Sequence, residues 1–275
     1  MTALRLEAPA KLNITLRVVG RRPDGHHLLD SEFAMLELAD RLLLMPGSSG
    51  LRVEGDGASG DVPVGAENLA WRGLRYALGG EPDALCLTLD KRIPAAAGLG
   101  GGSSDAAAAW RLGRAALGAR DVATADELRE LARIGADVPF FAAGAAAARV
   151  TGIGEVVEPR PARERHVVLA HPPFGLSTAA IFAELRTGEW GRLDNDLLAP
   201  ARRLRPELDA LFDLVARSGG EPRLTGSGPT VFSLTDDVER ATAVATALAA
   251  AGVRATMTRT RTTPPAIEPI TEEDA

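Results

Sequence analysis

The densest chemical signal lies in residues 98–105, which read Gly-Leu-Gly-Gly-Gly-Ser-Ser-Asp. Glycines let the backbone approach an oxyanion closely and adopt conformations that other residues avoid. A helix that follows such a segment adds unpaired N–H groups and the positive end of its dipole. Ser103 and Ser104 supply hydroxyls that can donate to phosphate oxygens or ligate magnesium. The segment therefore predicts a phosphate-binding loop.

Two common phosphate-binding motifs do not fit this segment. A P-loop requires a lysine after its second glycine, and no lysine follows these glycines. The dinucleotide fingerprint that would start at Gly98 requires glycine where Ser103 stands. A plain turn followed by a helix cap is the alternative, because that chemistry explains most Gly-Ser loops. The density of glycine at a strand-to-helix junction favours the phosphate site.

Two ionisable residues elsewhere have the types that a transfer reaction needs. Asp137 stands before Val138-Pro139, so it is either the cap of a short helix or a carboxylate that accepts a substrate proton. Lys11 begins an alternating run over residues 11–18 and shares its polar face with Asn13. A solvated strand residue is the alternative reading of Lys11. The Thr-Gly-Ser-Gly-Pro segment of residues 225–229 is either a plain turn or part of a site.

Hydrophobic periodicity and turn signals predict the elements that position these residues. We expect strands over residues 11–18, 42–45, 51–53, 85–91, 166–170, 230–234 and 253–260. We expect helices over residues 69–78, 105–117, 125–134, after 177, over 206–218 and over 238–251. The β–α–β ending favours a separate α+β layer, with a boundary near residues 158–165. Three prolines and several acids predict a loose tail over residues 263–275.

Composition excludes several classes of protein. The 275 residues include 31 basic and 37 acidic side chains, and this net charge of −6 argues against a general DNA or RNA binder. Cys86 is the one cysteine, which excludes an intrachain disulfide framework and a cysteine-rich zinc site. The N-terminus lacks the apolar core of a signal peptide, and no apolar run is long enough to span a bilayer. We therefore expect a cytoplasmic protein with no membrane partner.

Three segments together resemble the GHMP kinase superfamily: residues 8–13 (Ala-Pro-Ala-Lys-Leu-Asn), the glycine loop of residues 94–105, and residues 224–229. Matching stretches run in order from about residue 8 to residue 234, so the resemblance covers most of the chain. Two further segments narrow the resemblance to one branch of the superfamily: Pro-Asp-Gly-His-His at residues 23–27 and Gly-Ala-Asp-Val-Pro at residues 135–139. They resemble the branch that acts on a cytidine diphosphate derivative of methylerythritol in the non-mevalonate isoprenoid pathway.

The resemblance implies an α+β fold of two domains. Residues 1–158 would form an ATP-binding domain of the ribosomal-protein-S5-domain-2-like fold. Residues 159–275 would form a ferredoxin-like domain on the substrate side, with the loose acidic tail from about residue 263. The implied reaction uses ATP and Mg²⁺ to phosphorylate the 2-hydroxyl of the methylerythritol moiety, giving the 2-phosphate and ADP. The resemblance also implies small-molecule substrates, no nucleic acid, and a monomer or weak homodimer.

The resemblance also assigns roles to residues. Asp137 would act as general base, and Lys11 would orient it and the hydroxyl. ATP would contact Asn68, Leu69, Lys91, Pro94, Gly98, Leu99, Gly100, Gly101, Gly102, Ser103 and Ser104, with Ser103 or Ser104 near magnesium. The substrate would contact Asn13, His26, His27, Asp137, Phe182, Thr225, Gly226 and Ser227.

Within the substrate set, His27 would bond the cytosine edge and Phe182 would stack on the base. His26 stands where the family usually has a stacking tyrosine. The alternatives are a GHMP kinase for homoserine, mevalonate or a sugar, and a non-catalytic nucleotide-binding regulator.

Overall fold

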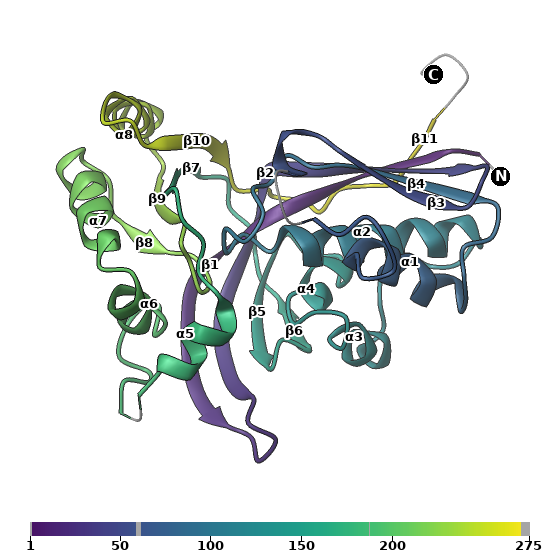
Figure 1. Cartoon of the computed structure of the whole chain (residues 1–275), viewed down its shortest axis with the longest axis horizontal. Coiled ribbons are helices and arrows are strands. Elements are labelled where there is room, and N and C mark those ends of the chain that lie inside the picture. The colour runs from purple at the N-terminus through teal and green to yellow at the C-terminus, as the bar shows by residue number, and fades with distance from the viewer. Residues whose placement is uncertain (1, 59–61, 187, 271–275) are drawn as a thin grey trace.

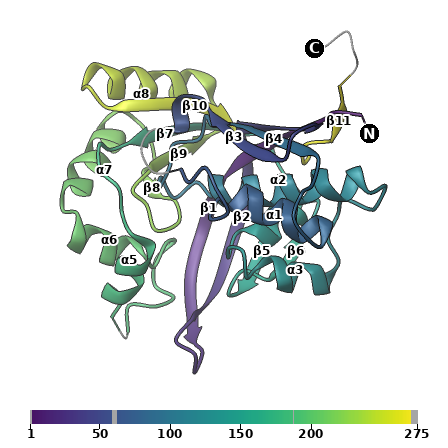
Figure 2. The same cartoon turned by 45° about the vertical axis from the view of Figure 1, so that its right-hand side comes forward.

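Two long paired strands run through the middle of the protein, with a lobe of helices and strands on each side (Figures 1 and 2). They are β1 (Leu4–Arg21) and β2 (His27–Pro46), which pair antiparallel along most of their length. This computed structural model describes residues 2–58, 62–186 and 188–270.

The first sheet has the strand order β11-β1-β2-β4-β3, with β5 pairing to β2 and β6 to β5. Its other strands are β3 (Gly50–Glu54), β4 (Leu85–Asp90), β5 (Ala147–Gly152), β6 (Val156–Pro159) and β11 (Glu268–Pro269). Its helices are a short 3-10 turn, η1 (Asp56–Ala58), then α1 (Leu69–Leu78), α2 (Gly101–Ala116), α3 (Ala125–Leu131) and α4 (Val138–Ala142).

Helices α1 and α2 pack tightly together and hold the start of α2 against the sheet. A Cβ atom on Gly73 of α1 would lie 2.1 Å from the carbonyl oxygen of Ala106 of α2. Such an approach requires a glycine facing a helix of small residues. Leu6, Leu42 and Leu87 of the sheet share a buried cluster with the α1 side chains. This packing of α2 against α1 and of α1 against the sheet fixes the position of the glycine segment that opens α2.

The second sheet has the antiparallel order β10-β7-β9-β8. Its strands are β7 (His166–His171), β8 (Arg223–Leu224), β9 (Val231–Thr235) and β10 (Arg254–Arg259). Its helices are α5 (Thr178–Glu184), α6 (Leu198–Leu204), α7 (Glu207–Arg217) and α8 (Val238–Ala250). This β–α–β–β–α–β pattern is that of a ferredoxin-like domain, as predicted. In chain order β6 is followed by β7, the first strand of the second sheet, and β11 later returns to the first sheet. We keep the division at residue 158 as a proposal.

Strand β1 contributes to the cores of both lobes. Leu16 and Val18 pack in the cluster of the second lobe, together with Val231 and Phe212. Leu12 lies in a cluster that both sheets form. The same strand therefore carries its polar residues to the junction between the lobes.

Three expectations about elements were wrong. Residues 42–45 are the end of β2, not a short strand, because β2 continues back to His27 in register with β1. Helix α2 begins at Gly101, not near residue 105, so most of the glycine segment of residues 98–105 is helical. The tail is not loose over residues 263–270, because Glu268–Pro269 pairs with β1 and Arg111 donates to the Pro265 carbonyl at 3.0 Å. Residues 271–275 lie outside the described residues.

Strands β5 and β6 and helix α6 were not predicted. Among the described residues, no helix is long and apolar enough to cross a membrane.

Candidate active site

The glycine segment adopts a conformation that requires glycine at two positions. Gly98 and Gly100 have φ of +75° and +70°, in the left-handed region. A Cβ atom on Gly98 would also lie 2.6 Å from the Thr225 carbonyl oxygen, which belongs to the second lobe. Gly100 is the N-cap residue of α2 and makes no side-chain cap, so the first N–H groups of the helix remain available to a ligand.

A cavity of about 490 Å³ opens over this segment between the two lobes. It brings together most of the predicted residues: Lys11, Asn13, Asn68, Leu69, Lys91, Pro94, Gly98, Leu99, Gly100, Gly101, Gly102, Ser103, Asp137, Phe182, Gly226 and Ser227. Thr225 is fully buried behind the cavity, where its Oγ1 accepts a hydrogen bond from the Asn13 N–H at 3.2 Å. Thr225 therefore supports the site from behind.

Lys11 and Asp137 form an ion pair at the centre of the cavity. The Lys11 Nζ lies 3.6 Å from the Asp137 Oδ2, and it donates to Asn13 Oδ1 at 2.5 Å and to the Gly98 carbonyl at 3.1 Å. Lys11 is only 3% exposed, so it is not a solvated strand residue. Asp137 makes no side-chain cap to α4, and its side chain is 30% exposed. Its carboxylate is therefore accessible to a substrate hydroxyl.

Asn13 fixes the direction of the Lys11 ammonium. The Asn13 Nδ2 donates to the Ser31 Oγ at 2.9 Å, and Ser31 in turn donates to the Thr15 carbonyl. The amide oxygen is thereby left for Lys11. Sequence reasoning missed Ser31. This residue of β2 lies opposite Leu16 of β1, a position that follows only from the pairing of the two long strands.

The Lys91 ammonium is held by two carboxylates and does not point freely into the cavity. Its Nζ lies 2.7 Å from Asp105 Oδ2 and also bonds Asp40, and all three side chains are buried. Burial opposes the charge on Lys91, but Asp105 and Asp40 outweigh it and raise the pKa of the ammonium. Burial raises the pKa of Asp105 well above its usual value, against the Lys91 charge.

Asp40 also accepts from the backbone N–H groups of Arg92 and Ile93, at 2.5 and 2.8 Å. Lys91, Asp40 and Asp105 therefore anchor the segment that leads into the glycine loop. Sequence reasoning missed Asp40 and Asp105, because these two residues and Lys91 lie in three segments that meet only in the folded chain.

The two serines of the loop have different surroundings. Ser103 lines the cavity, whereas Ser104 is 1% exposed and its Oγ is buried without a partner among the described residues. Ser103 is therefore the better placed of the two predicted magnesium ligands. The described residues hold no group of three His, Cys, Asp or Glu side chains suited to a metal ion. Magnesium bound here would take most of its ligands from phosphates and water, as Mg²⁺ commonly does.

An aromatic cluster borders the cavity through Phe182. The Phe182 ring, which lines the cavity, is stacked on His27 with centroids 5.1 Å apart and planes 22° apart. The Trp190 ring meets the His27 ring edge-on, with centroids 5.8 Å apart, and was not predicted. Burial, together with the charge on Arg21, lowers the pKa of His27, so its imidazole is neutral at pH 7.

His26 does not join this cluster. Its side chain is 65% exposed, and its Nδ1 lies 3.2 Å from Asp24 in the turn that precedes it. Successive residues at the start of a strand face opposite ways, so the turn that directs His27 inward directs His26 outward.

Comparisons with known proteins agree with this geometry. Residues 68–145 match the GHMP kinases N terminal domain, and residues 179–254 match the GHMP kinases C terminal domain. The 4-diphosphocytidyl-2-C-methyl-D-erythritol kinase of Dinoroseobacter shibae is 39% identical over 268 residues, which cover 88% of each chain. The kinase of the same name from Moorella thermoacetica is 37% identical, over 94% of this chain and all of the relative.

Solved structures agree as well. A crystal structure of 4-(cytidine 5'-diphospho)-2C-methyl-D-erythritol kinase is 34% identical, with a TM-score of 0.77 over 93% of this chain and 98% of that chain. A homoserine kinase from Cytophaga hutchinsonii, at 18% identity and a TM-score of 0.69, shares the fold. The chain belongs to the GHMP kinases, in the family of the 4-diphosphocytidyl-2-C-methyl-D-erythritol kinases.

Proposed function

We propose that this protein transfers the terminal phosphoryl group of ATP to the 2-hydroxyl of 4-diphosphocytidyl-2-C-methyl-D-erythritol, giving the 2-phosphate and ADP. The observation that carries this proposal is the Lys11–Asp137 ion pair, which lies in the same cavity as the glycine segment and bonds it through the Gly98 carbonyl. The family of the chain supports the substrate.

The two charged residues have complementary tasks in this reaction. The substrate hydroxyl gives its proton to the Asp137 carboxylate as its oxygen forms a bond to the terminal phosphorus. The bond from that phosphorus to the bridging oxygen of ATP breaks, and ADP leaves with the electron pair. Lys11 holds the carboxylate in place and offsets the negative charge that gathers near the transferred group.

The glycine segment would bind the ATP phosphates through its backbone. The N–H groups of Gly101, Gly102 and Ser103 open α2, where the helix dipole favours negative charge. Asn68 and Leu69, at the start of α1, would contact the adenosine end. Ser103 would hold magnesium, which neutralises phosphate charge during transfer. Lys91 would act by anchoring the loop, because its ammonium is already bound by two carboxylates.

The aromatic cluster would bind the cytosine. Phe182 offers a ring for stacking at the cavity, and neutral His27 has both a donor and an acceptor for a base edge. Asn13, Gly226 and Ser227 line the same cavity as Phe182, Lys11 and Asp137, and the methylerythritol moiety bound against them would reach Asp137. We further propose that the protein works in the cytoplasm on small molecules, as a monomer or weak homodimer, without nucleic acid or membrane.

A substrate panel tests this function. The purified protein is incubated with ATP and magnesium, and ADP release is measured with 4-diphosphocytidyl-2-C-methyl-D-erythritol, homoserine, mevalonate or galactose as acceptor. We expect ADP release with the cytidine diphosphate compound alone. Turnover of another acceptor without it would contradict the proposal. ATP binding without transfer to any acceptor would indicate a non-catalytic regulator.

A further inference from the structure

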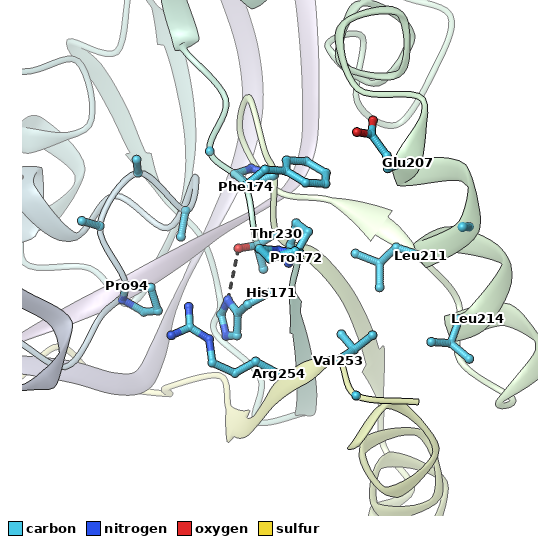
Figure 3. A pocket seen from close by; sticks show the side chains of 18 residues that line it. Pro94, His171, Pro172, Phe174, Glu207, Leu211, Leu214, Thr230, Val253 and Arg254 are labelled. Carbon is cyan, nitrogen blue, oxygen red and sulfur yellow. Dashed lines mark hydrogen bonds between the residues drawn. The ribbon is translucent and has the colours of Figure 1, made fainter. Parts of the chain in front are cut away.

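A second cavity, of about 860 Å³, is lined by the side chains drawn in Figure 3. It shares a wall with the active-site cavity. Pro94, Ala95, Ala96 and Ala97 line both cavities. Ala96 has a φ of +52°, which a residue with a side chain adopts only where its surroundings hold it. A ligand in the second cavity would therefore touch the segment that leads into the phosphate-binding loop.

One side of the second cavity is apolar. Figure 3 shows Leu211 and Leu214 projecting from α7 into the cavity, with Val253 beside them. Phe174, which follows β7, also lines the cavity. These side chains form a surface that an aliphatic or aromatic group can cover.

The other side carries a positive charge without a partner. Arg254 opens β10, is exposed, and makes no ion pair or side-chain hydrogen bond with the residues that the structure describes. Figure 3 shows its guanidinium beside His171, facing Pro94. The acid of the cavity, Glu207, lies at the far end and 3.8 Å from Arg205.

His171 adds polar groups to this side without adding charge. It is 4% exposed, and its ring nitrogens lie 3.4 Å from Thr230 Oγ1 and 3.2 Å from Thr256 Oγ1. Burial, assisted by the charge on Arg254, lowers the pKa of His171 to about 4. Arg254 is therefore the cation that faces this side of the cavity at neutral pH.

We propose that the second cavity binds a small amphipathic anion, with its acid group on Arg254 and its apolar body against Leu211, Leu214 and Val253. Its volume falls in the range of small-molecule sites, which combine apolar walls with a few convergent polar groups. A guanidinium binds carboxylate, sulfonate or phosphate through paired N–H groups. The proposal stands independently of the kinase reaction.

The fluorescent dye 1-anilinonaphthalene-8-sulfonate tests the proposal, because it joins an aromatic body to a sulfonate. It is titrated into the full chain with a saturating non-hydrolysable ATP analogue, so that the active site is occupied. We expect one dye per chain. Arg254→Gln should raise the dissociation constant about tenfold or more, since it removes a charge-assisted contact.

A second variant and a control separate this site from general dye binding. Ala210→Trp adds bulk from an exposed position of α7 into the cavity and should weaken the dye similarly. Arg133→Gln is the control, because Arg133 is in the first lobe, does not line the second cavity, and has a side chain that is 77% exposed. It should leave the dissociation constant of the dye unchanged. Thermal unfolding curves verify that each variant is folded.

Displacement of the dye by octanoate and by octyl phosphate distinguishes a carboxylate from a phosphate source. Displacement by either supports the site, and displacement by neither overturns it. Unchanged dye binding in both Arg254→Gln and Ala210→Trp would also overturn it. Dye binding that occurs without the ATP analogue but is lost when the analogue is saturating would assign the dye to the active-site cavity and overturn the proposal.

Discussion

The Lys11 ammonium lies 3.6 Å from the Asp137 carboxylate, although Lys11 is in β1 and Asp137 precedes α4. The ammonium is buried and held by Asn13 and the Gly98 carbonyl, whereas the carboxylate remains partly exposed. A fixed cation therefore positions an accessible base. The Gly98 bond also links this pair directly to the phosphate-binding segment.

Asp137→Asn keeps the shape of the side chain but removes its ability to take a proton. We expect turnover to fall at least about 100-fold, since a positioned base contributes on the order of 10²–10⁴-fold. KM values for ATP and the acceptor should stay within a few-fold, because the variant preserves the contacts that bind both. Asp126→Asn, at an exposed position of α3, is the matched control and should be unchanged. Near-normal turnover in Asp137→Asn would rule out its role as base.

Gly98→Ala would introduce two effects, the strain of a left-handed alanine and a clash where the two lobes approach each other, and a control variant separates them. Gly79→Ala is its control, because Gly79 has a φ of +72° against +75° for Gly98 but has open space around its Cβ position. Both variants should lose about 1–2 kcal/mol of stability from left-handed alanine. Only Gly98→Ala should also raise the KM for ATP, because its Cβ would displace the loop from Thr225 and Gly228. Equal kinetics in the two variants would contradict this account of the loop.

Lys91→Met would leave the Asp40 and Asp105 carboxylates buried without their cation. We expect a loss of about 3–5 kcal/mol in the free energy of unfolding, measured by denaturant titration. Adding Asp105→Asn to Lys91→Met should restore part of that loss, because one buried charge is removed. Arg129→Met breaks an exposed pair and should cost at most about 1 kcal/mol. A Lys91→Met variant as stable as Arg129→Met would show that Lys91 does not anchor the loop.

His171 makes the stability of the fold depend on pH. Its pKa is about 4 in the folded protein against 6.5 in the unfolded chain, so the unfolded chain binds the extra proton between these values. Stability is unaffected by this residue above pH 6.5 and falls as the pH drops from 6.5 toward 4. The loss should reach about 3 kcal/mol, at 1.36 kcal/mol for each pKa unit. His171→Gln should lack this part of the decline in unfolding experiments at pH 7, 5.5 and 4. If the free energy of unfolding declined with pH in the same way for the wild type and His171→Gln, the role of His171 would be refuted.

Local features of the site could be predicted from the sequence because they depend on neighbouring residues. Asn68 caps α1 and Gly79 ends it in the left-handed conformation, as their types and spacing indicate. Thr124 and Glu127 form a capping box at the start of α3, which the Thr-x-x-Glu spacing indicates. The glycine segment follows the same logic, since its positive φ angles lie at glycines.

Long-range features could not be predicted from periodicity. Lys91 with its two aspartates comes from three segments, and nothing in their local sequence indicates that they meet. Strand β11 has only two residues, one of them proline, so its own sequence does not indicate a strand. It forms because the folded protein offers it the free edge of β1. The Lys11–Asp137 pair was expected through the resemblance to a family, not through spacing.

Proton-coupled ³¹P NMR of the reaction with ATP, magnesium and 4-diphosphocytidyl-2-C-methyl-D-erythritol tests the central claim most directly. The 2-hydroxyl is on a carbon that carries the methyl group and no hydrogen, so a phosphate there has no proton three bonds away. We predict a new phosphomonoester singlet that grows together with ADP, and that grows at least about 100-fold more slowly in Asp137→Asn. A doublet would place the phosphate on the 3-hydroxyl and a triplet on the 1-hydroxyl. Either pattern, or no new resonance, would contradict the proposed function.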